Sequence, residues 1–150
     1  MASNNSFLAY ALVMLLAGLG IPVMAALNGA LGTRLQNPAL ATTILFAIGC
    51  ALSIAYLFVS GNVPKAIPRA PWHLFLGGVF VIFYVLSVTW IAPKFGVGNA
   101  IAFVLLGQLV SMAAIDHYAL LGAQRNPIDT GRLVGLILMA VGVFFAVRRR

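Results

Sequence analysis

FLAYALVMLLAGLGIPVMAAL, residues 7–27, is an uninterrupted run without a charged side chain. A helix needs about 20 apolar residues to cross the ~30 Å hydrocarbon core of a bilayer. Backbone groups in lipid have to be bonded within their own segment, and an apolar run without alternation excludes a transmembrane barrel strand. The stretch therefore predicts an α-helix that spans a membrane.

The rest of the 150-residue chain has the same character. Hydrophobic residues make up 63% of it, and its mean hydropathy is +1.07, whereas soluble domains are roughly half apolar. A soluble core of this size could not bury so much apolar surface, so the excess has to face lipid. We therefore expect an all-α polytopic membrane protein.

Five apolar segments are long enough to cross the bilayer and would form one transmembrane domain. They are separated by Gln36-Asn37-Pro38, by the proline-rich residues 61–71, by Pro93-Lys94 and by residues 122–129. Asp129 or Thr130 is suited to cap the fifth helix. The N-terminal residues lack the cations of a signal peptide, so we expect the first span to stay in the membrane. The predicted spans are residues 7–33, 39–60, 72–92, 97–121 and 130–147.

The cations are divided almost equally between the two sides of these spans. Four lie on the side of the N-terminus and five on the other side: Lys65, Arg69, Arg125 and Arg132, against Arg34, Lys94, Arg148, Arg149 and Arg150. By the positive-inside rule this is either a weak bias toward a cytoplasmic C-terminus or dual topology. In dual topology, two oppositely inserted copies would form an antiparallel ten-helix homodimer with the inverted-repeat symmetry of many transporters.

Several classes of function are disfavoured by composition. The net charge of +7 comes from cations that stand singly in connectors or at the C-terminus, which is typical of topology signals rather than of nucleic-acid binding. The single Cys50 excludes an internal disulfide. Because the sequence has no catalytic constellation, phosphate-binding glycine loop or metal-ligand spacing, we expect no enzyme activity, no cofactor and no metal.

The first span carries small residues and one proline along a single stripe. Such a stripe lets helices approach closely, and Pro22 removes the hydrogen bond to the carbonyl of Gly18, which predicts a kink there. Asn28 borders the stripe. Either the stripe packs tightly against another helix, or it faces a substrate and Asn28 contributes a polar contact. The stripe consists of Gly18, Pro22, Ala25, Gly29 and Gly32.

The fourth span carries the polar residues Gln108, Ser111, Asp116 and His117. Polar side chains at membrane depth indicate function by default, although they also bond neighbouring helices. Gln108 lies near the middle of the span and is a candidate for either role. Asp116 is either a proton-coupling carboxylate or an interfacial residue paired with His117 or Arg125.

Two further clusters have helical spacing. On the third span, Tyr84, Ser87 and Trp90 would either pack against lipid and other helices or line the path of a substrate. On the fifth span, small residues form a contact seam that could lie at the dimer interface. This seam consists of Gly131, Gly135 and Gly142.

Taken together, these features resemble the YdcZ family, the five-helix members of the drug/metabolite transporter (DMT) superfamily. The resemblance covers nearly the whole chain and implies a half-transporter of a bacterial inner membrane. Related small multidrug resistance transporters depend on a glutamate in the first helix, but this sequence has no Glu, which favours a neutral or anionic substrate. The resemblance rests on Pro22, Asn28-Gly29-x-Leu31-Gly32, Pro38-x-x-Ala41, Phe46-x-x-Gly49, Trp72, Gly77-Gly78, Pro93-x-x-Gly96, Gly107-Gln108 and Asp116-His117.

We therefore predict an alternating-access transporter for a small organic metabolite or xenobiotic, with a second copy, the bilayer and the substrate as its partners. Its cleft would be lined by Asn28 and Gln108, with Asp116 as coupling residue. Weaker candidates for the lining are Tyr84, Ser87 and Trp90. Two alternatives stay open: a dual-topology ion channel, and a membrane subunit that does not transport.

Overall fold

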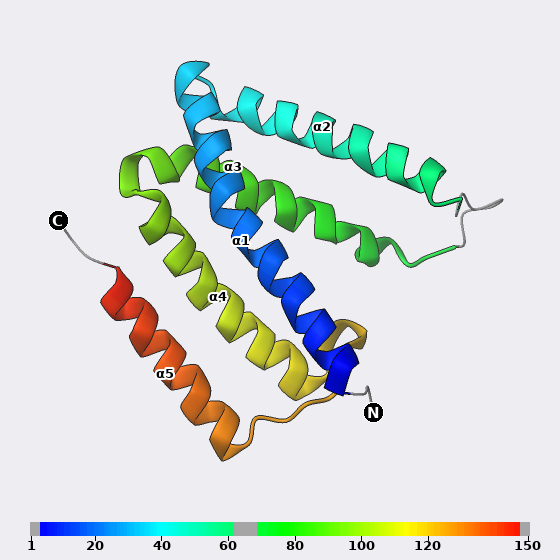
Figure 1. Cartoon of the computed structure of the whole chain (residues 1–150), viewed down its shortest axis with the longest axis vertical. Helices are drawn as coiled ribbons and strands as arrows, with labels where there is room; N and C mark the ends of the chain where they lie inside the picture. Colours follow the sequence, from blue (N-terminus) through cyan, green and yellow to red (C-terminus); the bar gives the residue numbers. More distant parts are fainter. Residues whose placement is uncertain (1–3, 62–68, 148–150) are drawn as a thin grey trace. The chain divides into compact units, whose positions relative to one another are not determined.

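Helices form all the regular structure in the part of the chain that the computed structural model describes, residues 4–61 and 69–147. This confirms the all-α prediction. Lys65 and Arg148–Arg150, which enter the charge count, lie outside these residues. In chain order the elements are α1 (Asn4–Arg34), α2 (Pro38–Val59), the 3-10 helix η1 (Trp72–Leu76), α3 (Gly77–Phe95), α4 (Val97–Tyr118), the 3-10 turn η2 (Leu120–Gly122) and α5 (Thr130–Ala146) (Figure 1).

The chain divides into two compact units, Met1–Lys94 and Phe95–Arg150. The first contains α1, α2, η1 and α3, and the second contains α4, η2 and α5. The expectation of one five-helix domain stays a prediction.

Among the described residues, four helical segments are long and apolar enough to cross a membrane: Phe7–Arg34, Pro38–Val59, Trp72–Phe95 and Val97–Tyr118. The helix α5 is apolar but has only 17 residues. At 1.5 Å per residue it is about 25 Å long, somewhat less than the ~30 Å hydrocarbon core. The fifth predicted span is thus a shorter helix than the other four.

In the first unit, α1 and α2 meet at a tight turn and diverge from it, as Figure 1 shows. The turn contains Gln36 with a positive φ of 51°. Asn37 then caps α2, because its side chain accepts a hydrogen bond from the backbone N–H of Leu40 at 3.0 Å. Pro38 occupies the first turn of α2, where a missing N–H costs nothing. The predicted break at Gln36-Asn37-Pro38 is confirmed.

The third helical segment begins at Trp72, as predicted, and ends three residues later than predicted, at Phe95. Residues 72–76 form the 3-10 helix η1, and the α-helix continues through Pro93 to Phe95. Proline removes one helical hydrogen bond, and its ring can be accommodated near a helix end. The expected stop at Pro93-Lys94 was therefore wrong by one turn.

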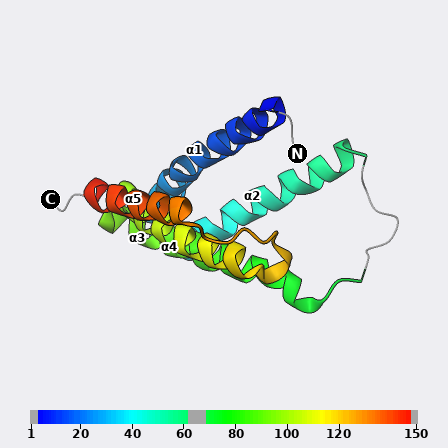
Figure 2. The ribbon, with the colours of Figure 1, turned by 90° about the horizontal axis from the view of Figure 1, so that it is seen from below.

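In the second unit, α4 and α5 lie side by side and run in opposite directions (Figures 1 and 2). The helix α4 ends at Tyr118, three residues before the predicted end. It stops there because Ala119 and Leu121 have left-handed backbone angles, with φ of 51° and 56°. Asp129 caps α5 by accepting a hydrogen bond from the backbone N–H of Arg132 at 2.7 Å, which confirms the predicted cap.

Candidate functional site

The C-terminal part of α1 packs against both other helices of the first unit at Gly32. A Cβ atom placed on Gly32 would lie 3.1 Å from Cγ2 of Thr89, 3.3 Å from Cα of Pro38 and 3.7 Å from Cβ of Ala41. Two of these distances are shorter than ordinary van der Waals contact. Only glycine fits this junction without displacing a neighbour.

One residue that we placed in the substrate cleft lies at this junction. Asn28 is 4% exposed, and its Nδ2 donates a hydrogen bond to Oγ1 of Thr89 at 2.6 Å. The Thr89 hydroxyl donates in turn to the carbonyl of Val85 at 2.7 Å. The Asn28 amide thus links α1 to α3 through the Thr89 hydroxyl.

Thr89 also carries a carbonyl that the helix leaves free. Four residues later stands Pro93, which has no N–H to donate to it. A Cβ placed on Gly29 of α1 would lie 3.9 Å from this carbonyl oxygen and 3.3 Å from Cγ of Pro93. Gly29 therefore lets α1 approach the proline turn of α3 closely.

Two other predicted site residues line one cavity in the first unit. The cavity has a volume of about 420 Å³ and lies between the start of α2 and the face of α3 that carries Ser87 and Trp90. The ammonium of Lys94 lies 4.5 Å from the centre of the Trp90 ring, which is within the range of a cation–π interaction. The lining residues are Asn37, Pro38, Ala39, Phe83, Leu86, Ser87 and Trp90.

Tyr84 does not line this cavity. Its hydroxyl is buried and has no hydrogen-bond partner among the described residues, and the same is true of the Thr42 hydroxyl on α2. Buried hydroxyls usually find a partner. The two groups are therefore left to bind water, a ligand or another protein group.

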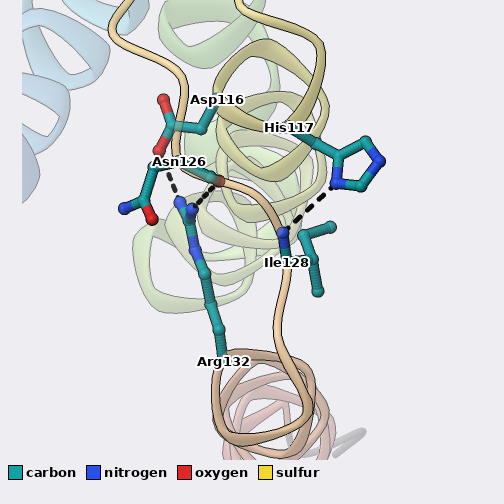
Figure 3. A network of polar contacts seen from close by, with 5 residues as sticks. All are labelled: Asp116, His117, Asn126, Ile128 and Arg132. Carbon is teal, nitrogen blue, oxygen red and sulfur yellow. Dashed lines mark hydrogen bonds and ion pairs between the residues drawn. The ribbon is translucent and has the colours of Figure 1, made fainter.

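The second unit contains a network of charged and polar groups at the ends of α4 and α5, shown in Figure 3. Arg132 of α5 forms an ion pair with Asp116 of α4, and it also donates to the carbonyl of Asn126 at 2.6 Å. On the other side of the connecting loop, Nδ1 of His117 accepts from the N–H of Ile128 at 3.2 Å. Asp116 is thus paired with Arg132, and the expected pairing with His117 or Arg125 was wrong.

A second cavity of about 410 Å³ lies between α4 and α5. Its lining is aliphatic except for His117 and Tyr118. Gln108 does not contribute to it and is exposed. The role of Gln108 as a lining residue stays a prediction.

The remaining glycines of the predicted seams have open surroundings. A Cβ on Gly18, Gly135 or Gly142 would meet no atom within 4 Å, and one on Gly131 would meet only its neighbour Asp129. The helix α1 also continues through Pro22 as one 31-residue helix. A kink at Gly18 and a dimer contact through α5 stay predictions.

Three of the residues at the site in the first unit that we did not predict are polar or charged: Asn37, Thr89 and Lys94. Thr89 could have been found from its spacing, because a proline four residues later marks a carbonyl without its helical partner. Asn37 was recognised only as part of a break between helices. Lys94 was counted only as a topology signal.

Comparison with known proteins identifies the chain at this point. A family model described as "Putative inner membrane exporter, YdcZ" matches residues 9–145. The chain belongs to the YdcZ family. No curated protein and no solved structure matches it.

Membership of the YdcZ family confirms the resemblance seen in the sequence, and it places the chain in the inner membrane as a multi-pass protein. The description of the family is that of a membrane exporter. Asn28, Thr89 and the residues around Trp90 therefore belong to a YdcZ-type transporter of the DMT type.

Proposed function

We propose that two copies of this YdcZ-family chain, inserted in opposite directions, export a small organic metabolite or xenobiotic by alternating access. Three features support the proposal. The family is described as an exporter. The cations are nearly balanced about the five predicted spans. No residue in the most apolar 18-residue window of α1 is buried, so this helix has most of its surface free for a partner or for lipid.

The observation that carries the proposal is the cavity beside Ser87 and Trp90. It is an open groove, since Phe83 and Trp90 on its wall are 72% and 55% exposed. It combines aromatic and aliphatic walls with one hydroxyl and one amide, a lining that suits a small organic molecule. Its volume of about 420 Å³ is within the usual range for such sites. The neighbouring junction of Asn28, Gly32 and Thr89 would hold α1 and α3 in register while the cavity opens to one side or the other.

Asp116 is the candidate coupling residue, because it is the only carboxylate within a described helix. Its carboxylate is paired with Arg132. To take up a proton it would have to leave this partner, so coupling would require α4 and α5 to separate at this end.

The test is a panel of solutes screened for thermal stabilisation of the purified protein, followed by efflux from proteoliposomes for those that bind. The parent is compared with Ser87→Ala, Trp90→Phe and Gln108→Ala. Ser53→Ala is the matched control, since Ser53 lies exposed on α2 and bonds only the carbonyl of Cys50 in its own helix.

We expect Ser87→Ala and Trp90→Phe to reduce stabilisation and efflux of the same solutes, and Ser53→Ala to behave as the parent. Solutes that stabilise all variants equally would place the binding site elsewhere. Conductance far above the turnover of a carrier would show a channel instead. A paired protein without any solute efflux would indicate the non-transporting subunit.

A further inference from the structure

The cavity beside Trp90 has a cation next to it and no acidic residue in its unit. Residues 1–94 contain no Asp and no Glu, because the two acidic residues of the chain are Asp116 and Asp129. The Lys94 ammonium therefore has no carboxylate of its own unit to pair with. Its observed contact is with the face of the Trp90 ring.

Both polar side chains that line the cavity can donate hydrogen bonds. Oδ1 of Asn37 already accepts from the N–H of Leu40, and the NH2 group of this amide can donate to a ligand. Ser87 provides a hydroxyl that can donate. With the ammonium of Lys94 beside Trp90, the site offers three kinds of donor and no acidic acceptor.

The remaining surface is flat and apolar. Phe83 and Trp90 supply aromatic faces, and Pro38, Ala39 and Leu86 supply aliphatic contacts. An aromatic body can stack on such faces. An anionic group can then accept charge-assisted hydrogen bonds, which are stronger than neutral ones. An organic cation would meet the like charge of Lys94 beside Trp90 and no carboxylate of this unit.

From these observations we propose that the cavity binds an organic anion, with a flat aromatic body against Phe83 and Trp90 and a carboxylate that accepts hydrogen bonds from Lys94 and Asn37. This inference rests on the proposed function, and it adds the chemical class of the substrate.

The test uses the fluorescence of Trp90. The chain has two tryptophans, so Trp72→Phe leaves Trp90 as the single reporter, and Trp72 lies in η1, outside the cavity. Purified protein in phosphatidylcholine nanodiscs is titrated with the quencher 4-nitrobenzoate, with the neutral 4-nitrobenzamide and with 4-nitrobenzylammonium. The three probes share a nitroaromatic body and differ in charge.

We expect saturable quenching by the anion, with a Kd about tenfold lower than that of the amide, as for a gained charge-assisted hydrogen bond. Lys94→Gln should remove this advantage, whereas Lys94→Arg should keep most of it. Arg125→Gln, which removes one exposed cation of the second unit, should have no effect. Equal affinity for all three probes, or an unchanged Kd in Lys94→Gln with a parental melting curve, would overturn the proposal.

A lipid headgroup is the other source of an anion with an apolar body. Nanodiscs that contain phosphatidylglycerol distinguish the two: quenching that stays saturable with the same Kd supports a solute site. Loss of quenching there would assign the site to lipid and overturn the proposal. Efflux of neutral or cationic solutes by protein that does not bind 4-nitrobenzoate would refute this inference alone, while the proposed transport function would stand.

Discussion

The two units of the chain hold their helices together in different ways. In the first, the contact is uncharged and buried: the Asn28 amide bonds the Thr89 hydroxyl beside a glycine junction. In the second, the contact is charged and partly exposed, because the side chains of Asp116 and Arg132 are 29% and 20% exposed. One contact depends on close fit and the other on groups that water can reach.

This difference predicts unequal sensitivity to change. A buried neutral contact in a membrane protein cannot be replaced by water, so its loss should appear fully in stability. An ion pair that water reaches is screened by salt and contributes less. Adding a side chain at the glycine junction, or removing the buried amide, should therefore destabilise the first unit more than a single change of charge destabilises the second.

The largest effect is expected for Gly32→Leu. The new side chain would start 3.1 Å from Thr89 and 3.3 Å from the backbone of Pro38, which should lower the free energy of unfolding by about 2–3 kcal/mol through overpacking. Unfolding in mixed micelles with a rising fraction of SDS measures it. Gly49→Leu on α2 is the matched control, since its surroundings are open, and an equal loss in both variants would show that the junction is not special.

A smaller effect is expected from the pair Asn28→Ala and Thr89→Val. In a double-mutant cycle the coupling energy should be about 0.5–1.5 kcal/mol, the range of interhelical hydrogen bonds in membranes. Because the pair is buried, this coupling should not change between low and high salt. A coupling near zero would mean that the 2.6 Å contact does not stabilise the unit.

The smallest effect is expected in the second unit. Asp116→Asn should cost about 1 kcal/mol or less, as for a partly exposed ion pair, and most of this loss should disappear in 1 M salt. Exchanging the charges, Asp116→Arg with Arg132→Asp, should recover the stability. The exchange also places each charge at the helix end that favours it.

The exchanged variant separates structure from coupling as well. If Asp116 only joins α4 to α5, the variant should transport like the parent. Loss of proton-dependent efflux despite restored stability would assign Asp116 to coupling. If Asp116→Asn lowered the free energy of unfolding as much as Gly32→Leu does, the contrast between the units would be contradicted.

Local signals predicted the helices well. Asn37-Pro38 begins α2 and Asp129 caps α5 because capping depends on neighbours in sequence. The end of α4 was missed because Ala119 and Leu121 adopt left-handed angles without a glycine or proline to indicate them. The end of α3 was predicted too early because Pro93 was taken as a stop, whereas a proline can be accommodated in the last turn of a helix.

Contacts between helices were predicted poorly. The partner of Asn28 is 61 positions away and that of Asp116 is 16 positions away, and nothing in the local sequence indicates either. Arg125 and His117 were nearer choices for Asp116 in sequence, but the loop at residues 119–129 turns back and brings Arg132 to it instead. Family membership, by contrast, was recognisable from ordered glycines and prolines along the chain.

The central claim is that copies of this chain sit in the membrane in both directions. Its most direct test uses the single cysteine: Cys50→Ser gives a cysteine-free chain, into which Gln124→Cys places one exposed thiol in the loop before α5. Sealed, right-side-out membrane vesicles are treated with a membrane-impermeant maleimide before and after permeabilisation. We predict that about half of the molecules react in sealed vesicles and the rest only afterwards, as balanced cations imply. Labelling of all molecules, or of none, before permeabilisation would contradict the account.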